Sequence, residues 1–280
     1  MKVLVTGFNG QLGFDVIKVL KTRGILSKGV DIADFDLTDS EAVSQYIRKY
    51  APTVVVHCAA YTAVDKSEED KDVCYAVNVT GTENIARICK EIHAKMVYIS
   101  TDYVFNGEGD RPFEVNDPKA PKSQYGLTKS RGEDIVREYL SEYFIVRTAW
   151  AFGINGNNFV KTMIKLGQEK EEVTVVNDQY GSPTYTVDFA CLLCDMIVTD
   201  KYGIYHATNE GYCSWYDFAC AIMNAAGLTS RVIPVTSEQY PSKAVRPKNS
   251  RLSKDSLEQA GFNRLPTWQD ALKRYVEELG

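Results

Sequence analysis

The feature that most constrains the fold is a series of three glycines directly after a short apolar segment at the N-terminus. Residues 2–6 are mainly aliphatic, Gly7-Phe8-Asn9-Gly10-Gln11-Leu12-Gly13 follows, and an amphipathic segment continues to about residue 22. A strand, a glycine turn and a helix in this order are typical of dinucleotide binding. Glycine lets the backbone approach a pyrophosphate, and the helix N-terminus attracts its charge. The pattern favours a cofactor site at Gly7, Gly10 and Gly13 over a tight turn without a ligand.

An acidic residue follows where dinucleotide-binding proteins hold the adenosine ribose. A second strand should end near Val30-Asp31, and Asp31 lies 24 residues after Gly7. In Rossmann folds an acid about 20 residues after the glycine turn binds the ribose hydroxyls. No arginine follows Asp31 to neutralise a 2′-phosphate, which favours NADH or a loose choice between NADH and NADPH. An acid exposed in a surface loop is the alternative.

The stretch Tyr125-Gly126-Leu127-Thr128-Lys129 carries the candidate chemistry. If it is helical, residues four apart share one face, so the Tyr125 hydroxyl and the Lys129 ammonium can reach the same point. A free phenol has a pKa of about 10, and a nearby cation lowers it. Such a tyrosine can protonate a carbonyl oxygen while hydride reaches the carbon. An exposed tyrosine beside a solvated lysine is the alternative interpretation.

Alternating strand and helix patterns over residues 1–150 predict the fold class. Strands are expected at 53–57, 95–100 and 143–147, and a long helix at 73–92. This rhythm indicates an α/β fold with a Rossmann-type, doubly wound parallel sheet. Thr101 and Asp102 follow a strand, at the sheet edge where such folds bind ligands. Residues 151–280 are expected to form mainly a smaller C-terminal substrate-binding lobe, with part of it able to return to the sheet.

Composition excludes several function classes. The net charge of −5 and pI of about 5.4 argue against non-specific nucleic-acid binding, which needs a basic surface. No apolar run approaches the ~20 residues that cross a bilayer, and the N-terminus does not resemble a signal peptide, so we expect a cytoplasmic protein. Cys191-x-x-Cys194 lies in a helical segment without a second cysteine pair, which predicts core thiols rather than a metal site.

Taken together, several long stretches resemble dTDP-4-dehydrorhamnose reductases, which are extended short-chain dehydrogenases/reductases. The resemblance runs nearly end to end. It is carried by residues 7–13, Ala59-Ala-Tyr-Thr-Ala-Val-Asp65, Ser100-Thr-Asp-Tyr-Val-Phe105, Tyr125-Gly-Leu-Thr-Lys129, Arg147-Thr-Ala-Trp150, Gly156-Asn-Asn-Phe159, Asn177-Asp-Gln-Tyr-Gly-Ser-Pro-Thr184 and Arg246-Pro-Lys-Asn-Ser-Arg-Leu252.

The resemblance implies reduction of the C4 keto group of dTDP-4-dehydro-L-rhamnose by NADPH or NADH, giving dTDP-L-rhamnose, a polysaccharide precursor. Tyr125 would donate the proton, Lys129 would lower its pKa and bind the nicotinamide ribose, and Thr101 would hydrogen-bond the same oxygen. The implied cofactor residues are Gly10, Gln11, Leu12, Asp31, Asp36, Leu37, Ala60, Tyr61 and Thr62. The implied substrate residues are Asp102 and Trp150 at the sugar, and Asn158, Phe159 and Arg246 near the nucleotide diphosphate.

Related activities are separated by single positions. Tyr103 stands where nucleotide-sugar dehydratases carry a glutamate, which disfavours dehydration. Two alternative functions remain: a 4-epimerase, which needs the same tyrosine and lysine, and a non-catalytic dinucleotide-binding regulatory subunit.

Two further positions bear on the site and on metal binding. Asn78 is either a solvated helical residue or part of a proton relay. Val187 stands where some family members have a magnesium-binding glutamate, so we expect no metal and a monomer or weak homodimer.

Overall fold

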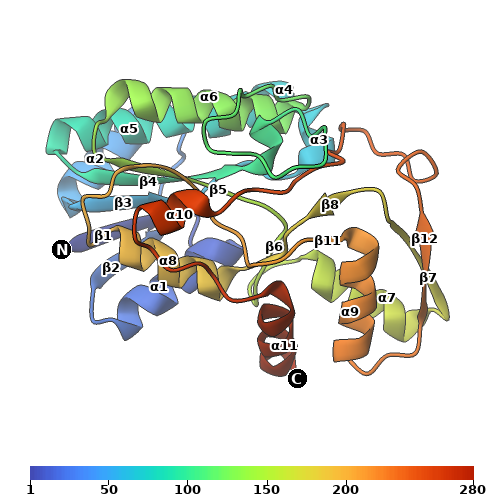
Figure 1. The fold of residues 1–280 in the computed structure, drawn as a ribbon. Coiled ribbons are helices and arrows are strands. Elements are labelled where there is room, and N and C mark those ends of the chain that lie inside the picture. The colour runs from blue at the N-terminus through green and yellow to red at the C-terminus, as the bar shows by residue number, and fades with distance from the viewer.

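A parallel six-stranded sheet forms the centre of the computed structural model, which describes residues 1–280 (Figure 1). The strand order is β10-β5-β4-β3-β1-β2, and every neighbouring pair is parallel. This confirms the expected Rossmann-type doubly wound sheet. The strands are β1 (Lys2–Thr6), β2 (Leu26–Val30), β3 (Val54–His57), β4 (Lys95–Thr101), β5 (Tyr143–Thr148) and β10 (Gly203–His206).

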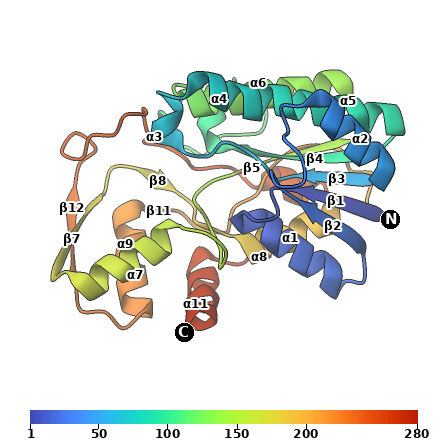
Figure 2. The same ribbon diagram turned by 180° about the vertical axis from the view of Figure 1, so that it is seen from behind.

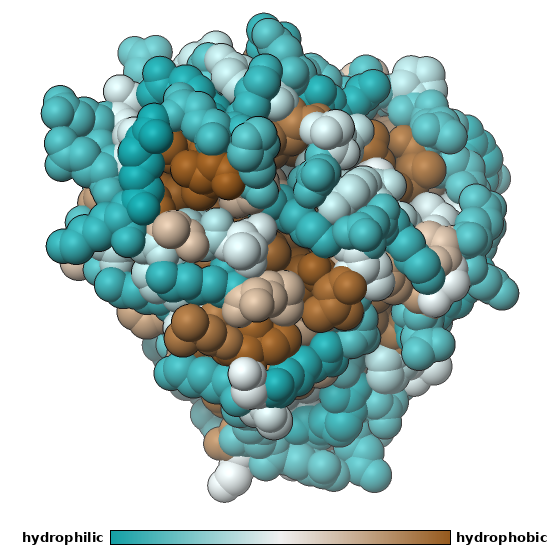
Figure 3. Space-filling view, turned by 90° about the vertical axis from the view of Figure 1, so that its left-hand side faces the viewer, coloured by the Kyte–Doolittle hydropathy of each residue, from teal (hydrophilic) through white to brown (hydrophobic).

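Helices cover both faces of this sheet (Figures 1 and 2). One face carries α2 (Ser40–Tyr50), α5 (Gly81–Ile92) and α6 (Gln124–Tyr139), and the other carries α1 (Gln11–Thr22) and α8 (Thr186–Met196). Each face encloses its own cluster of buried aliphatic side chains. Burial on both faces explains why the central strands β1 and β3 are almost continuously apolar, whereas the edge strand β2 is partly polar. On the face nearest the N-terminus, apolar residues reach the surface as separate patches among polar ones (Figure 3).

A smaller lobe stands at the carboxyl ends of the strands and has a third apolar cluster (Figure 1). It contains α7 (Phe159–Glu169), α9 (Trp215–Ala225), α11 (Trp268–Leu279) and the parallel pair of β7 (Glu172–Val176) and β12 (Arg231–Val235). The chain crosses between the two parts repeatedly, because α8 and β10 come after α7 and β7 but belong to the sheet layers. Short elements complete the fold: β6 (Ala151–Phe152), β8 (Tyr180–Gly181), β9 (Thr184–Tyr185), β11 (Cys213–Ser214), α3 (Val64–Ser67), α4 (Lys71–Tyr75), η1 (Ala76–Thr80), η2 (Asp102–Val104) and α10 (Asp255–Gln259).

The expected helix over residues 73–92 is present, but it contains a π-helical turn that the sequence does not signal. The structure has α4, then the π-helical turn η1, then α5. Asn78 lies in η1, where it is 1% exposed, and its side chain bonds the backbone of Tyr61 through both its oxygen and its nitrogen, at 2.8 and 3.1 Å. A π-helical turn therefore directs a buried polar side chain to the loop after β3. The solvated alternative for Asn78 is excluded.

No helix in the structure is both long and apolar enough to cross a membrane. All seven cysteines are free thiols, and no group of three or more His, Cys, Asp or Glu side chains could hold a metal ion. Cys194 is buried in the apolar cluster under α8, and Val187 packs against the cluster of the lobe.

Candidate active site

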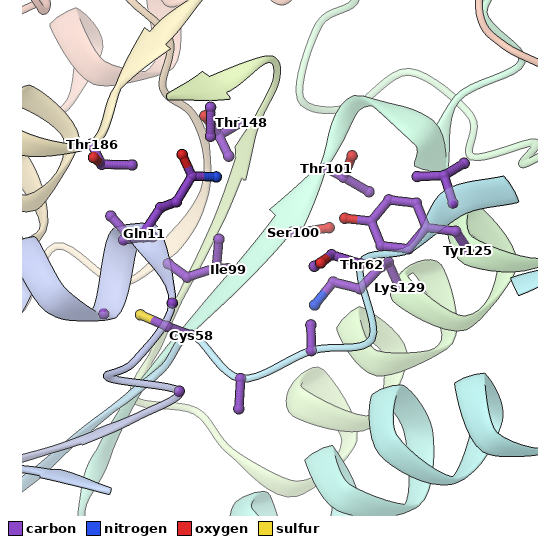
Figure 4. A pocket seen from close by; sticks show the side chains of 18 of the residues that line it. Gln11, Cys58, Thr62, Ile99, Ser100, Thr101, Tyr125, Lys129, Thr148 and Thr186 are labelled. Carbon is purple, nitrogen blue, oxygen red and sulfur yellow. The ribbon is translucent and has the colours of Figure 1, made fainter. Parts of the chain in front are cut away.

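A cavity of about 850 Å³ lies between the carboxyl ends of the strands and the lobe. Figure 4 shows its wall running from Gln11 on α1, past Cys58 and Ile99, to Tyr125 and Lys129 on α6. The sheet order reverses direction between β1 and β3, and this cavity lies at that reversal. Open α/β sheets bind their ligands at such a point.

The glycine turn forms one end of the cavity and has no room for side chains. Gly7 adopts φ +68°, and a Cβ on it would lie 2.7 Å from the backbone of Ala59. A Cβ on Gly13 would lie 2.3 Å from the carbonyl oxygen of Gly7. Gly10 caps α1 without any side-chain hydrogen bond, so the first amides of the helix stay available to an anion. This cradle fits the pyrophosphate of a dinucleotide.

Asp31 lies beside the glycine turn, with its carboxylate held by backbone amides. It accepts hydrogen bonds from the nitrogens of Asn9 at 3.1 Å and Ile32 at 2.9 Å. The cavity is lined by two basic side chains, Lys129 and Arg246, which lie beside Tyr98 and Tyr103 rather than beside Asp31. This end of the cavity therefore carries a carboxylate and no cation.

Tyr125 and Lys129 lie in the first turns of α6, which Ser123 begins by accepting a hydrogen bond from the Gly126 nitrogen at 3.1 Å. In Figure 4 the hydroxyl groups of Tyr125 and Thr101 lie close to one another, with Lys129 beneath them. The end of β4 and the start of α6 thus present a phenol, an alcohol and an amine to the same part of the cavity.

The expectation that Lys129 gives Tyr125 a depressed pKa is wrong in its net direction. Burial raises the pKa of Tyr125 above its ordinary value, and the hydrogen bond with Thr101 only partly offsets this. Burial also lowers the pKa of Lys129 to about 7. Desolvation disfavours the charged form of either group, and at this site it is the largest cause of both pKa shifts.

Asp102 is a buried carboxyl group next to the catalytic candidates. One of its oxygens accepts the Thr101 hydroxyl at 2.9 Å, and the Ser250 hydroxyl also stabilises the charged carboxylate. Burial raises the pKa of Asp102 to about 6. Asp102 also belongs to the lining of the cavity, next to Thr101.

We expect Asp102→Asn to stabilise the fold at neutral pH. The folded-state pKa of about 6 exceeds the ordinary 3.8, so the charged form costs stability above about pH 6 and nothing below about pH 4. The asparagine should therefore increase the unfolding free energy at pH 7.5 by about 1–3 kcal/mol. Urea unfolding at pH 7.5 and pH 4 measures this. A variant that is less stable at pH 7.5 would contradict the assignment.

Trp150 lines the lobe side of the cavity in a strained conformation, with φ 51°. Its ring stacks on that of Trp215, with centroids 3.7 Å apart and planes at 15°, and Phe159 packs against Trp215 at 4.5 Å. Gly181 makes room for the indole, since a Cβ there would lie 2.7 Å from it. These contacts form an aromatic wall that a planar or sugar ring can contact.

Arg246 and Asn158 occupy two other points of the cavity wall. Arg246 forms an ion pair with Asp65, and its Nη1 lies 3.5 Å from the hydroxyl of Tyr103. Asn158 caps α7, and its amide donates to Gln11 at 3.0 Å, which joins the lobe to the start of α1.

All but one of the site residues predicted from the sequence line the cavity. Tyr61 is not part of its lining, because Asn78 holds its backbone and its hydroxyl donates to Asp70 at 2.9 Å. The expectation that Tyr61 binds the cofactor stays a prediction. The residues that line the cavity as predicted are Gly7, Gly10, Gln11, Leu12, Gly13, Asp31, Asp36, Leu37, Ala60, Thr62, Thr101, Asp102, Tyr125, Lys129, Trp150, Asn158, Phe159 and Arg246.

Sequence reasoning missed other lining residues, among them Trp215, Gln179, Ser250 and Thr186. Trp215 is the first residue of α9, and a capping box between Ser214 and Asp217 marks this helix start in the sequence. That signal predicts a helix but not which way its first side chain faces.

Known proteins match this chain over nearly its whole length. A family model described as the RmlD substrate binding domain matches residues 1–280. SpsK of Bacillus subtilis, a spore coat polysaccharide biosynthesis protein, is 42% identical over 99% of this chain and 97% of its own. A crystal structure of a dTDP-4-dehydrorhamnose reductase from Clostridium acetobutylicum has TM-score 0.98 and 44% identity over 100% of this chain and 99% of its own. That of the Bacillus anthracis reductase in complex with NADP has TM-score 0.97 and 42% identity over 99% of this chain and 100% of its own.

Proposed function

The chain belongs to the RmlD family and is an NAD(P)H-dependent reductase, and we propose that it reduces the C4 carbonyl of dTDP-4-dehydro-L-rhamnose to give dTDP-L-rhamnose. The observation that carries this proposal is the convergence of Thr101, Tyr125 and Lys129 on one wall of a cavity whose far end is a glycine cradle. The named relatives support the choice of sugar, since two of the three are dTDP-4-dehydrorhamnose reductases.

The cofactor would lie along the cavity from the glycine turn to Lys129. The amides at the start of α1 would hold the pyrophosphate, Asp31 the adenosine ribose, and Lys129 the nicotinamide ribose. When bound, the reduced nicotinamide supplies hydride to the carbonyl carbon.

The protein's own part is to supply and control one proton. Tyr125 donates its hydroxyl proton to the C4 oxygen, and because burial raises its pKa, the hydroxyl carries that proton at neutral pH. Thr101 hydrogen-bonds the same oxygen and orients the carbonyl. The Lys129 ammonium stabilises the phenolate that Tyr125 becomes, since an opposite charge nearby favours the charged form.

Residues 151–280 would contribute part of the substrate contacts. Asp102 and Trp150 would contact the sugar, and Asn158, Phe159 and Arg246 would lie near the diphosphate. An arginine suits that group, because its planar fork of donors matches phosphate oxygens.

The deciding assay is loss of reduced-nicotinamide absorbance with enzymatically generated dTDP-4-dehydro-L-rhamnose. We expect oxidation that depends on the sugar. A folded protein that binds NADH but shows no oxidation would exclude this substrate, and the same preparation would then be tested for 4-epimerisation and for binding of a protein partner.

We expect NADH to be used more efficiently than NADPH. The carboxylate of Asp31 and the lack of a basic side chain beside it leave a 2′-phosphate without a counter-charge. The kcat/KM for NADH should exceed that for NADPH by about tenfold. Asp31→Asn should lower the ratio of the two kcat/KM values, because it weakens NADH binding and removes the repulsion between the carboxylate and the 2′-phosphate of NADPH. A wild type that prefers NADPH, or a ratio that Asp31→Asn leaves unchanged, would contradict the role given to Asp31.

A further inference from the structure

The ammonium group of Lys129 is buried without an anionic partner. Lys129 is 3% exposed, and its Nζ makes no salt bridge or hydrogen bond within the protein. Figure 4 shows the amine directed into the cavity. The group that it does contact is Tyr98 on β4, whose ring centroid lies 4.1 Å from Nζ.

The other titratable groups around Lys129 do little to stabilise its buried positive charge. They are Tyr125 and Glu133 on α6, His57 and Cys58 at the end of β3, Cys74 on α4, and Tyr98 on β4. All except Glu133 are uncharged near neutral pH, because burial raises the pKa of the thiols and phenols and lowers that of His57 to about 3. Glu133 is itself paired with Arg147 through two hydrogen bonds of 2.8 Å.

The Tyr98 ring is fixed in place beneath the amine. Its hydroxyl donates to the carbonyl oxygen of Lys129 at 3.2 Å, and the side chain is fully buried. Gly132, on the next turn of α6, provides the space, since a Cβ there would lie 2.1 Å from the Tyr98 hydroxyl oxygen. Strand β4 and helix α6 therefore hold the ring face and the ammonium together.

We propose that Tyr98 is a positioning residue of the reductase site, whose ring face keeps the Lys129 ammonium charged while leaving its N–H donors free for a ligand. An aromatic face attracts a cation through its quadrupole, most strongly where water is excluded. A carboxylate in the same place would also stabilise the charge, but it would occupy one or more of the three donors. The inference rests on the proposed function only in naming the ribose hydroxyls as the ligand.

The test is an NMR titration of Lys129 in protein labelled with 13Cε-lysine and free of cofactor, with the signal assigned by Lys129→Arg. Tyr98→Phe retains the ring and should leave the titration midpoint unchanged. Tyr98→Leu removes the ring face and should lower the midpoint by about one pH unit. Equal midpoints in all three proteins, or a shift in Tyr98→Phe as large as in Tyr98→Leu, would overturn the proposal.

Two further measurements keep the test decisive. If Tyr98→Leu does not fold, phenylalanines of increasing fluorination at position 98 weaken the ring face at nearly constant shape, and a midpoint that does not fall along this series overturns the proposal. As a matched control, Tyr205→Leu removes another buried tyrosine ring from the core and should leave the Lys129 midpoint unchanged.

NADH affinity, read from fluorescence at pH 6 and pH 8.5, separates the role of Tyr98 from the proposed contact between Lys129 and the nicotinamide ribose. If Tyr98→Leu shifts the Lys129 midpoint but the NADH affinity does not change, the result counts against the ribose contact and not against the role of Tyr98.

Discussion

Tyr125→Phe is expected to reduce kcat with dTDP-4-dehydro-L-rhamnose by about 10²–10⁴-fold, the usual contribution of a positioned general acid. The substitution removes the proton donor and leaves the ring. Tyr125 is the phenol that meets the Thr101 hydroxyl, and the neighbouring phenol of Tyr103 does not take its place. Tyr103 packs edge-on against Tyr125 at 5.5 Å, with its own hydroxyl near Arg246.

The measurement is the steady-state rate of NADH oxidation, together with the dissociation constant for NADH. We expect NADH binding to stay within about twofold, since the pyrophosphate and adenosine contacts are unchanged. Tyr75→Phe, at a tyrosine 49% exposed on α4, is the matched control and should keep full activity. A Tyr125→Phe enzyme with more than a tenth of the wild-type kcat would exclude Tyr125 as the proton donor.

The fold and the main chemical residues could be predicted because local sequence patterns encode them. The glycine turn, the strand-to-helix rhythm and the four-residue spacing of Tyr125 and Lys129 each depend on neighbouring residues only. The resemblance to dTDP-4-dehydrorhamnose reductases is likewise confirmed by the family match over residues 1–280.

The features of the site that could not be predicted from the sequence depend on contacts between distant segments. Tyr61 turns away from the cavity because of Asn78, which a π-helical turn places there, and no periodicity in the sequence signals such a turn. The aromatic wall of Trp150 and Trp215 joins residues 65 positions apart. The pKa of Tyr125 rises because the assembled protein excludes water from it, and burial is a property of the whole fold.

Arg147→Met should destabilise the fold more than any other single change considered. Arg147 is 2% exposed and Glu133 1% exposed, and two hydrogen bonds of 2.8 Å join them. The methionine leaves the buried carboxylate with only the Ser100 hydroxyl at 2.5 Å and Lys119 at 3.6 Å. Removing one partner of a buried pair typically costs about 3–5 kcal/mol, because the remaining charge stays desolvated. Urea unfolding at pH 7.5 measures the loss.

The double variant Arg147→Met/Glu133→Leu separates the two contributions to this loss. If the unpaired charge causes it, removing the carboxylate as well should recover at least half of the lost free energy, even though the pair itself is gone. As a control, Arg48→Met breaks the exposed pair with Glu91 on the surface, which should cost less than about 1 kcal/mol. A double variant as unstable as Arg147→Met would show that the packing of Arg147 against Phe105, at 4.9 Å from the ring, matters more than its charge.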